Sequence, residues 1–343
     1  PARGDTVLTL WSLEDNETVR AAIAAFAKTH PEAEVEYTVA QPSGAEGPGR
    51  EDLLRALNTE LLAGGGPDVL ILDGVDYAPY ARQGLLADLY GTVSDLKLLD
   101  NITGPFMQGD AVYLLPARFV LPVLYAPKDR LAAVSSWEGL IQSFLDAPAR
   151  PDAAPNDAGF YDALPESERY AFSVKDTADL VEMLLAASAP ALLSEQGGLN
   201  DAALGDFYTG VEAVARHYGL GGYRPANPQL DVAAVSSASG EDPVIARQSS
   251  QEYSWGRALF AREWMGTPAM LLWMRGQDDG EEPPMAAALQ PGLAEGAYRP
   301  QVLAAVNAAT AQEALAKEFV RTLLCDEVQG TVFYLDGLPV TQS

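Results

Sequence analysis

The sequence is poor in the residues that build metal and nucleophilic centres. Its 343 residues include one cysteine, Cys325, and two histidines, His30 and His217. A single thiol excludes an internal disulfide and a Cys-rich metal site, and two histidines leave little room for a Ser-His-Asp arrangement. We therefore expect no resident metal and no cofactor. Cys325 lies on an apolar stretch of helical pattern, and we predict that it is a small buried hydrophobe.

Basic residues are also scarce. The chain has 22 Lys and Arg against 48 Asp and Glu, a formal net charge of −26. Proteins that bind nucleic acids need clustered basic side chains for the phosphates, so we expect no nucleic-acid partner. The excess of acid suits either a protein kept in solution by self-repulsion or one from an acidic or salty exterior. No uninterrupted apolar run approaches the roughly 20 residues of a membrane-spanning helix.

The residues that are present indicate a folded protein of two domains. Hydrophobic residues make up 48% of a chain that is too long for one average core. In the first part of the chain we predict strands at residues 7–11, 35–39 and 68–72, with helices at 17–29 and 51–63. This β-α-β-α-β order predicts a parallel sheet with right-handed crossovers.

The remainder of the chain has a less regular pattern. Tyr253-Ser254-Trp255 is predicted to precede a helix, because Leu259, Phe260 and Trp264 follow at helical spacing. The other predicted elements are a helix at 77–83, strands at 109–117 and 120–126, a helix beginning at Trp137, strand-like runs at 286–291 and 301–306, and a helix at 311–325.

Candidate ligand contacts gather where the first and third predicted strands end. Ligands of open α/β sheets lie at the carboxyl ends of strands, and Trp11 and Asp73 both stand there. Trp11 is either an aromatic platform for a sugar ring or a core tryptophan. Asp73 is either a ligand acceptor or a helix cap. Tyr77 follows it as a candidate contact, and Glu14 is either a contact or a capping residue.

Several sequence blocks together resemble a known family. In chain order they are "LTLWS", "HPEAEVEY", "GGGPDVLILDG…YARQGLLADL", "GDAVYLLPARFVLPVLYAPKD", "SSWEGL", "ALFAREWMGTPAMLL" and "AAVNAATAQEALAKEFVRTLLCDEVQ" followed by "GLPV". Each block is loose alone, and their order makes the match specific. The order resembles the extracellular solute-binding proteins of ABC importers, specifically the carbohydrate-type, maltose-binding-protein-like family 1.

This resemblance implies a fold and a division of the chain. The expected fold is α/β and two-lobed, of the periplasmic-binding-protein type, with a mostly parallel sheet flanked by helices in each lobe and hinge segments between them. Lobe one would comprise residues 1–117 and 301–329. Lobe two would comprise residues 118–300 and 330–343.

The resemblance also implies a function. The protein would be the substrate-binding component of an ABC transporter, without enzymatic activity. It would capture an oligosaccharide or a similar polyhydroxylated solute between its lobes, close on it, and deliver it to the membrane permease. We expect a monomer at the extracellular face of the cytoplasmic membrane, held there by a lipid anchor. The sequence does not identify the sugar.

Further ligand contacts are expected on the crossing segment and on lobe two. Arg118 and Phe119 lie at the crossing, where the Arg fork would hold a hydroxyl or carboxylate or else pair structurally with an acid. Trp255 lies near a predicted helix start and Trp273 at a predicted strand end. Many family members carry a Gly-aromatic pair after the "AM" strand; here Trp273-Met274-Arg275-Gly276 stands instead, and Arg275 is included as a candidate contact.

Two other functions stay open at this point. A secreted glycoside hydrolase would use a pair of carboxylates about 5–10 Å apart, which 48 acidic residues could supply. A structural or adhesive surface protein would respond to no ligand. Residues 150–171 and 227–250 match no pattern, and the acidic run at 278–282 is either a solvated loop or a calcium site without the usual ligand spacing.

Overall fold

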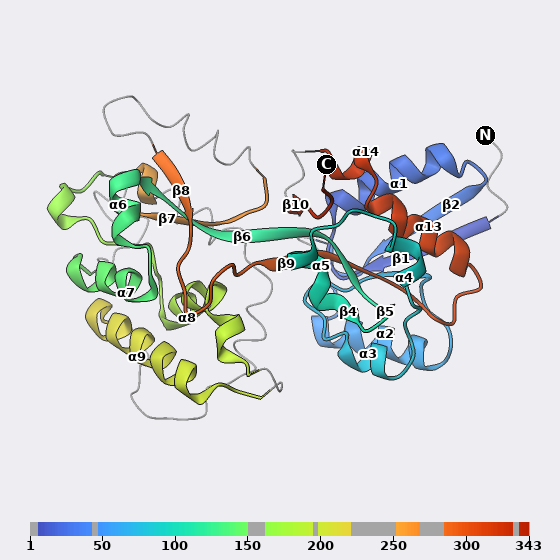
Figure 1. The fold of residues 1–343 in the computed structure, drawn as a ribbon, viewed down its shortest axis with the longest axis horizontal. Helices are drawn as coiled ribbons and strands as arrows, with labels where there is room; N and C mark the ends of the chain where they lie inside the picture. The colour runs from blue at the N-terminus through green and yellow to red at the C-terminus, as the bar shows by residue number, and fades with distance from the viewer. Residues whose placement is uncertain are drawn as a thin grey trace. The chain divides into compact units, whose positions relative to one another are not determined.

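The chain folds into two compact units, drawn in Figure 1. The computed structural model describes residues 6–42, 47–149, 162–194, 198–220, 252–267, 285–331 and 336–342. Unit 1 comprises Pro1–Val120 and Arg299–Ser343, and unit 2 comprises Leu121–Tyr298. The chain passes from unit 1 to unit 2 inside strand β6 (Leu115–Pro127) and returns immediately before strand β9 (Arg299–Val306).

Unit 1 is built on a mixed sheet with the strand order β2-β1-β3-β9-β6-β10. The remaining strands of this sheet are β1 (Thr6–Ser12), β2 (Ala33–Val39), β3 (Val69–Ile71) and β10 (Leu338–Pro339). β1 pairs in parallel with β2 and with β3, which confirms the predicted β-α-β-α-β start. β9 runs antiparallel to β3 and β6, and β10 runs antiparallel to β6.

Helices cover both faces of this sheet. α1 (Glu17–Thr29) begins at the N-cap Asn16 and packs on α13 (Glu313–Leu323), with the rings of Phe26 and Phe319 edge to face at 5.4 Å between centroids. The other face carries α2 (Arg50–Leu62) over a second apolar cluster. That cluster contains Trp11, Leu57, Leu61, Leu70, Tyr80 and Leu303.

Shorter elements complete unit 1. They are α3 (Ala78–Arg82), α4 (Tyr90–Val93), α5 (Asp100–Thr103), η1 (Gly104–Phe106), the hairpin of β4 (Met107–Gln108) and β5 (Ala111–Val112), and α14 (Asp326–Gln329). Cys325 is the N-cap residue of α14 and is partly exposed. The prediction of a buried Cys325 within a helix is therefore wrong, because α13 ends two residues before it.

Asp68 fastens the beginning of β3 to its neighbours. The backbone N–H and the hydroxyl of Thr9 both donate to Asp68 Oδ2 at 2.7 Å. The hydroxyl of Thr310 donates to the other carboxylate oxygen. One side chain thus joins β1, the start of β3 and the segment ahead of α13, which fixes the register of the central strands.

Unit 2 consists of helices and two strands arranged around the second half of β6. β7 (Ala261–Met265) and β8 (Met285–Leu289) both pair antiparallel with β6. The helical elements are α6 (Lys128–Ala133), α7 (Trp137–Asp146), η2 (Glu166–Glu168), α8 (Thr177–Ala186), η3 (Ala189–Leu192) and α9 (Asp201–Tyr218). Buried aromatic rings fill the core: Phe172 lies 4.8 Å from both Phe144 and Phe260 between centroids.

Three predictions about the elements are corrected here. Residues 261–265 form strand β7 and not a helix, because their backbone groups pair with residues 121–125 of β6. The strands predicted at 109–117 and 120–126 merge, from Leu115 onward, into the single strand β6. The described ladders of unit 2 run antiparallel, whereas a mostly parallel sheet was predicted.

The C-terminal tail is also placed differently from the prediction, which put residues 330–343 in lobe two. β10 pairs with Arg118 and Phe119 of β6, both in unit 1. The backbone N–H of Gln342 donates to the carbonyl of Lys97 at 2.8 Å. These bonds hold the described tail, residues 336–342, in unit 1.

Candidate functional site

The carboxyl ends of the parallel strands form one edge of unit 1. Ser12, the last residue of β1, is in register with Val39 of β2 and with Ile71 of β3. The segments that follow these three strands therefore emerge side by side. We call this the carboxyl edge: residues 12–16, 39–42 and 72–77, with Tyr37 of β2 and the described tail residue Asp336. Small ligands of open α/β sheets bind at such an edge.

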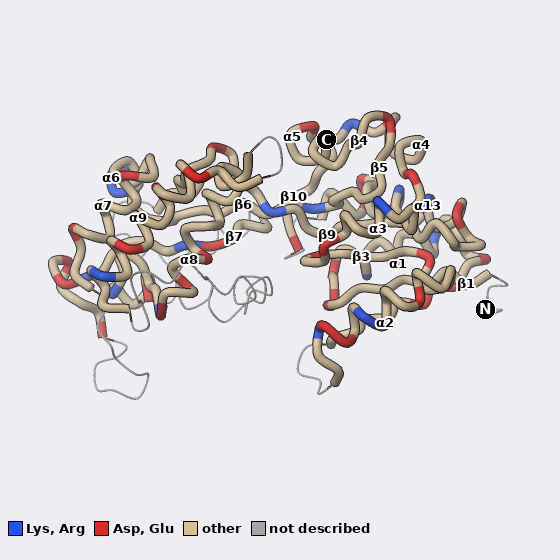
Figure 2. The backbone as a smooth tube through the Cα atoms, turned by 90° about the horizontal axis from the view of Figure 1, so that it is seen from below, with Lys and Arg blue, Asp and Glu red and all other residues tan. Residues whose placement is uncertain are grey.

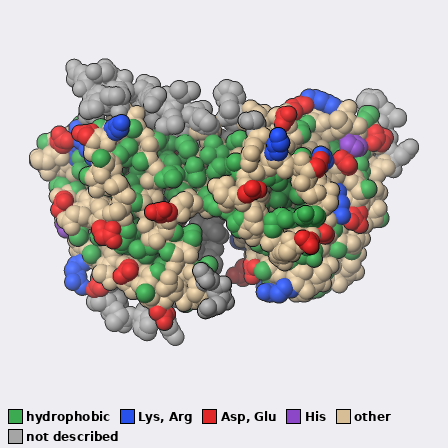
Figure 3. All heavy atoms as spheres, viewed as in Figure 1, with side chains coloured by type: hydrophobic (Ala, Val, Ile, Leu, Met, Phe, Trp, Pro, Cys, Tyr) green, Lys and Arg blue, Asp and Glu red, His purple; other side chains and the backbone are tan. Residues whose placement is uncertain are grey.

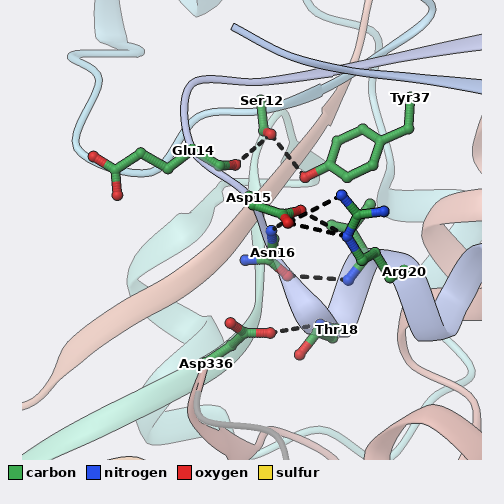
Figure 4. A network of polar contacts seen from close by, with 9 residues as sticks. Ser12, Glu14, Asp15, Asn16, Thr18, Arg20, Tyr37 and Asp336 are labelled. Atoms are coloured by element: carbon green, nitrogen blue, oxygen red, sulfur yellow. Dashed lines mark hydrogen bonds and ion pairs between the residues drawn. The ribbon is translucent and has the colours of Figure 1, made fainter. Parts of the chain in front are cut away.

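A network of polar contacts occupies this edge (Figure 4). Ser12 Oγ donates to the backbone carbonyl of Glu14 at 2.5 Å and lies 2.7 Å from the hydroxyl of Tyr37. A serine hydroxyl has one hydrogen, so Tyr37 is the donor in the second bond. Burial raises the pKa of Tyr37 to about 12, although its hydrogen bond with Ser12 acts to lower this pKa. Tyr37 thus remains a neutral hydroxyl at the edge.

Asp15 and Arg20 neutralise each other beside this network. Arg20 donates from Nε and Nη2 to the two carboxylate oxygens of Asp15, at 2.8 to 3.1 Å. The hydrogen bond from Arg20 lowers the pKa of Asp15. The guanidinium carbon lies 5.6 Å from the centre of the Tyr37 ring. Both members of the pair are about half exposed, so the pair is an orienting contact and not a strong source of stability.

The N-terminus of α1, which also lies at this edge, is already capped. The side chain of Asn16 accepts the N–H of Val19 at 3.0 Å. Asp336, from the tail, accepts the N–H of Thr18 at 2.5 Å. A free helix N-terminus attracts anions, but here a carboxylate of the chain itself fills the position. The edge therefore offers hydrogen bonds to a neutral ligand more readily than to an anionic one.

Asp73 lies two residues after the end of β3 and bonds to the neighbouring strand β9. Its Oδ1 accepts the backbone N–H of Leu303 at 3.0 Å. Burial raises the pKa of Asp73 to about 6, while the N–H groups of Leu303 and Val302 act to lower it. Among charged neighbours, Asp336 raises this pKa and Arg299 lowers it. The predicted ligand acceptor therefore already bonds to the protein, and contact of its carboxylate with a ligand stays a prediction.

Tyr77 and Glu14 are two further predicted contacts at this edge. Tyr77 is partly exposed, and its ring is tilted against Phe106 with 6.3 Å between centroids. Burial of one side raises the pKa of Tyr77. Glu14 is exposed and is not the N-cap of α1, a role that Asn16 fills. The structure thus places the ring of Tyr77 and the carboxylate of Glu14 on segments of the same edge.

Trp11, the predicted platform, lies in the core of unit 1. Only 7% of its surface is exposed, and it belongs to the apolar cluster of Leu57 and Leu70. Residues of a strand alternate between faces, and the face of Trp11 is covered by α2. The structure therefore favours the alternative of a core tryptophan.

Replacing Trp11 with alanine is expected to lower the free energy of unfolding by about 3–5 kcal/mol, because a large buried ring leaves a cavity. Trp11→Phe keeps an aromatic ring and should cost less than half as much. Urea unfolding of both variants measures the difference. A loss below about 1 kcal/mol for Trp11→Ala, together with weaker sugar binding, would instead support the platform role.

Arg118 and Phe119 are buried in strand β6. Arg118 has no exposed surface, and its guanidinium donates to the carbonyls of Val328 at 2.6 Å and Gln329 at 3.3 Å. Phe119 is 8% exposed and is in register with Leu338 of β10. These contacts give Arg118 a structural role, which was its alternative, and they include bonds to backbone carbonyls.

The remaining predicted contacts belong to unit 2. Trp255 is partly buried and follows a short helical turn at residues 252–254. Trp273, Arg275 and the acidic run at 278–282 lie outside the described residues, as do residues 150–161 and 227–250. The structure therefore gives no geometry for these candidates.

Sequence reasoning missed two members of the edge. Tyr37 is visible as the aromatic residue that faces the end of the first strand, once strands at 7–11 and 35–39 are taken as parallel neighbours. Asp336 carries no local signal, because its position depends on where the tail docks. Within the described residues, no cluster of three or more His, Cys, Asp or Glu side chains could hold a metal ion.

Charge alone does not mark the site. In Figures 2 and 3, Asp and Glu lie on many elements of both units, with Lys and Arg interspersed among them.

A shallow pocket of about 390 Å³ lies at the end of the strands opposite to the carboxyl edge, where Thr6 and Ala33 begin β1 and β2. None of the described helices combines the length and the apolar character that crossing a bilayer requires.

The comparison with protein families decides the identity. The bacterial extracellular solute-binding protein family matches residues 11–330. The chain belongs to this family. No curated protein sequence matches the chain. What is known of this solute-binding protein by comparison therefore comes from the family match and from similarity to solved structures.

Solved structures share the fold of this solute-binding protein. An extracellular solute-binding protein of family 1 from Alicyclobacillus acidocaldarius is 15% identical, with a TM-score of 0.58 over 99% of this chain and 80% of that chain. An ABC substrate-binding protein from Listeria monocytogenes, in complex with cycloalternan, is 13% identical, with a TM-score of 0.57 over 99% and 81%.

A third structure is the maltose-maltodextrin binding protein of Alicyclobacillus acidocaldarius. It is 13% identical, with a TM-score of 0.54 over 98% of this chain and 82% of that chain. At this level of identity the similarity shows the fold: the two-lobed α/β architecture of periplasmic binding proteins.

Proposed function

We propose that this protein is the solute-binding component of an ABC importer and that its solute is a neutral carbohydrate. The observation that carries the proposal is the carboxyl edge of unit 1, which includes the uncharged hydroxyls of Ser12 and Tyr37 and the partly exposed ring of Tyr77, while the helix N-terminus is already capped. Sugars present hydroxyls and apolar C–H faces, which such groups bind.

The solved structures of the same fold support a carbohydrate. The listerial protein was solved with cycloalternan, a further one with raffinose, and another is named for maltose and maltodextrin. Each shares less than a fifth of its residues with this chain, so these ligands define a class of solute and not one sugar.

The proposed contacts in unit 1 are Glu14 and Tyr77, with the hydroxyl of Tyr37 as an additional hydrogen-bonding group. Phe119, Trp255, Trp273 and Arg275 stay predictions. The proposal also includes delivery to a membrane permease, a monomeric state, the absence of catalysis, and a lipid anchor at the extracellular face of the cytoplasmic membrane.

Isothermal titration calorimetry with a sugar panel tests the proposal. The panel is maltotriose, raffinose, xylotriose and tagatose, with glucuronic acid and glucose 6-phosphate as anionic controls. We expect binding of at least one neutral sugar and no binding of the anions. Chromatography of the same mixtures separates binding from hydrolysis, because an enzyme would release shorter sugars. Binding of no sugar, or cleavage, would contradict the proposal.

Replacing Tyr77 with alanine should weaken binding of the sugar that the panel finds by about 1–2 kcal/mol, roughly tenfold in affinity, because a stacking surface is lost. The matched control is Tyr208→Ala, which removes an exposed tyrosine from α9 in unit 2. Equal affinity of the two variants would remove Tyr77 from the site. Calorimetry gives both values.

A further inference from the structure

Strand β9 carries an unusual backbone conformation at Val302. Its φ is 54°, in the left-handed region, and its side chain has no exposed surface. A β-branched residue adopts this region only where its surroundings enforce it, because its side chain crowds the backbone there. Contacts in the surrounding structure must therefore keep the backbone of Val302 in this conformation.

The pairing of β9 with its neighbours is interrupted at this residue. On the β3 side the ladder ends with Ile71 opposite Ala304, followed by a bond from Leu72 N–H to the carbonyl of Leu303 at 2.8 Å. On the β6 side, pairs are formed at Leu303 and at Gln301 but not at Val302 between them. The backbone N–H of Leu303 therefore has no partner strand on the β3 side.

The Asp73 carboxylate takes the place of that missing strand. Its Oδ1 accepts the N–H of Leu303 at 3.0 Å, and the N–H of Val302 also stabilises its charge. An unsatisfied buried N–H costs free energy, so this acceptor stabilises the kinked backbone over an extended one. Asp73 stands two residues after the end of β3, a position from which a side chain can extend the ladder.

We propose that Asp73 is a positioning residue, whose carboxylate clamps the left-handed turn at Val302 and thereby sets the course of residues 299–301 past the carboxyl edge of unit 1. β9 is antiparallel to β3, so these residues continue beyond the end of β3 on the side of Tyr77. The clamp is a property of the fold; its consequence for a ligand rests on the proposed function.

The charged groups around the clamp are Asp336, ahead of β10, and Arg299, at the start of β9. Asp336 opposes the charge of Asp73 and Arg299 favours it. Because burial withdraws the carboxyl from water, its titration lies near pH 6. The titration of Asp73 can therefore be followed at the Leu303 amide, which reports on the bond between them without any ligand.

A double-mutant cycle tests the clamp. Asp73→Leu removes the acceptor, Asp73→Asn keeps an acceptor oxygen without the charge, and Val302→Gly allows the left-handed turn without enforcement. Trp11 is the tryptophan of unit 1 among the five of the chain, so its ¹⁹F resonance after 5-fluorotryptophan labelling reports the melting of this unit. We expect the loss of melting temperature on Asp73→Leu to fall by half or more in the Val302→Gly background.

The Leu303 amide supplies the second measurement, by NMR on the unsubstituted protein and on Asp73→Asn. Its shift should titrate near pH 6 in the former and stay constant in the latter. Its hydrogen exchange should accelerate about tenfold to a hundredfold in Asp73→Leu and little in Asp73→Asn. Should Asp73→Leu fail to fold, the titration and Asp73→Asn still decide.

Two outcomes would overturn the proposal. Equal losses of melting temperature in the Val302 and Val302→Gly backgrounds would show that Asp73 does not hold the turn. A Leu303 amide that ignores both the pH near 6 and the Asp73→Asn change would show that the bond is absent. Neither measurement needs a sugar, so failure of the clamp and failure of the carbohydrate proposal are distinguishable.

Discussion

Replacing Arg118 with methionine is expected to lower the free energy of unfolding of unit 1 by about 3–5 kcal/mol, because several buried carbonyls each lose a charge-assisted hydrogen bond that contributes about 1–3 kcal/mol. Arg118 is fully buried, and its guanidinium donates to the carbonyls of Val328, Gln329 and Gly337. Methionine fills similar volume but donates no hydrogen bond, so these carbonyls lose a partner. Urea unfolding followed by the ¹⁹F resonance of Trp11 isolates the effect on unit 1.

The control for this variant is Arg55→Met. Arg55 pairs with Asp52 on the surface of α2, with 72% of its side chain exposed, and such pairs contribute about 0–1 kcal/mol. Similar losses for the two variants would show that the buried guanidinium does not hold the tail. The side chain of Gln329 supports the same region, since it donates to Ala117 at 3.0 Å and accepts from Val340 at 2.9 Å.

Acidification should stabilise unit 1 through Asp73. Its pKa is about 6 when folded, against 3.8 for the free side chain, so the folded state binds a proton more readily between these values. The contribution of Asp73 to the free energy of unfolding is thus fully present below pH 3.8 and is lost as the pH rises through 6. Lowering the pH from 7 to about 4.5 should therefore add about 2 kcal/mol to the free energy of unfolding through this group.

Asp73→Asn should abolish this contribution, because the amide does not titrate. The control is Asp95→Asn: the bond from Arg321 lowers the pKa of Asp95, so this group titrates below the tested range. Urea unfolding at several pH values between 4.5 and 7 gives the slopes. The same slope in Asp73→Asn and in the unsubstituted protein would contradict a raised pKa at Asp73.

Local patterns predicted the first half of unit 1 well. α1 was predicted to the residue, because apolar spacing marks its buried face and Asn16 and His30-Pro31 mark its ends. The parallel order of β1, β2 and β3 followed from alternating elements. These signals come from residues that are close to one another in the sequence, so they can be read without the structure.

Features that depend on distant partners were not predictable. Residues 261–265 have helical spacing, yet β6 supplies backbone partners that make them a strand. Trp11 was correctly placed at the end of a strand, but which helix covers its face decides between platform and core. Asp336 reaches the N-terminus of α1 only because β10 docks on β6. The candidate site is therefore only partly visible in the sequence.

The position of Cys325 makes this protein convenient to label. It is the sole thiol of the chain, partly exposed, and its carbonyl accepts the N–H groups of Val328 and Gln329. Those two residues in turn accept the bonds from Arg118. A fluorophore coupled there through a maleimide would report detachment of the tail without any cysteine having to be engineered in or removed.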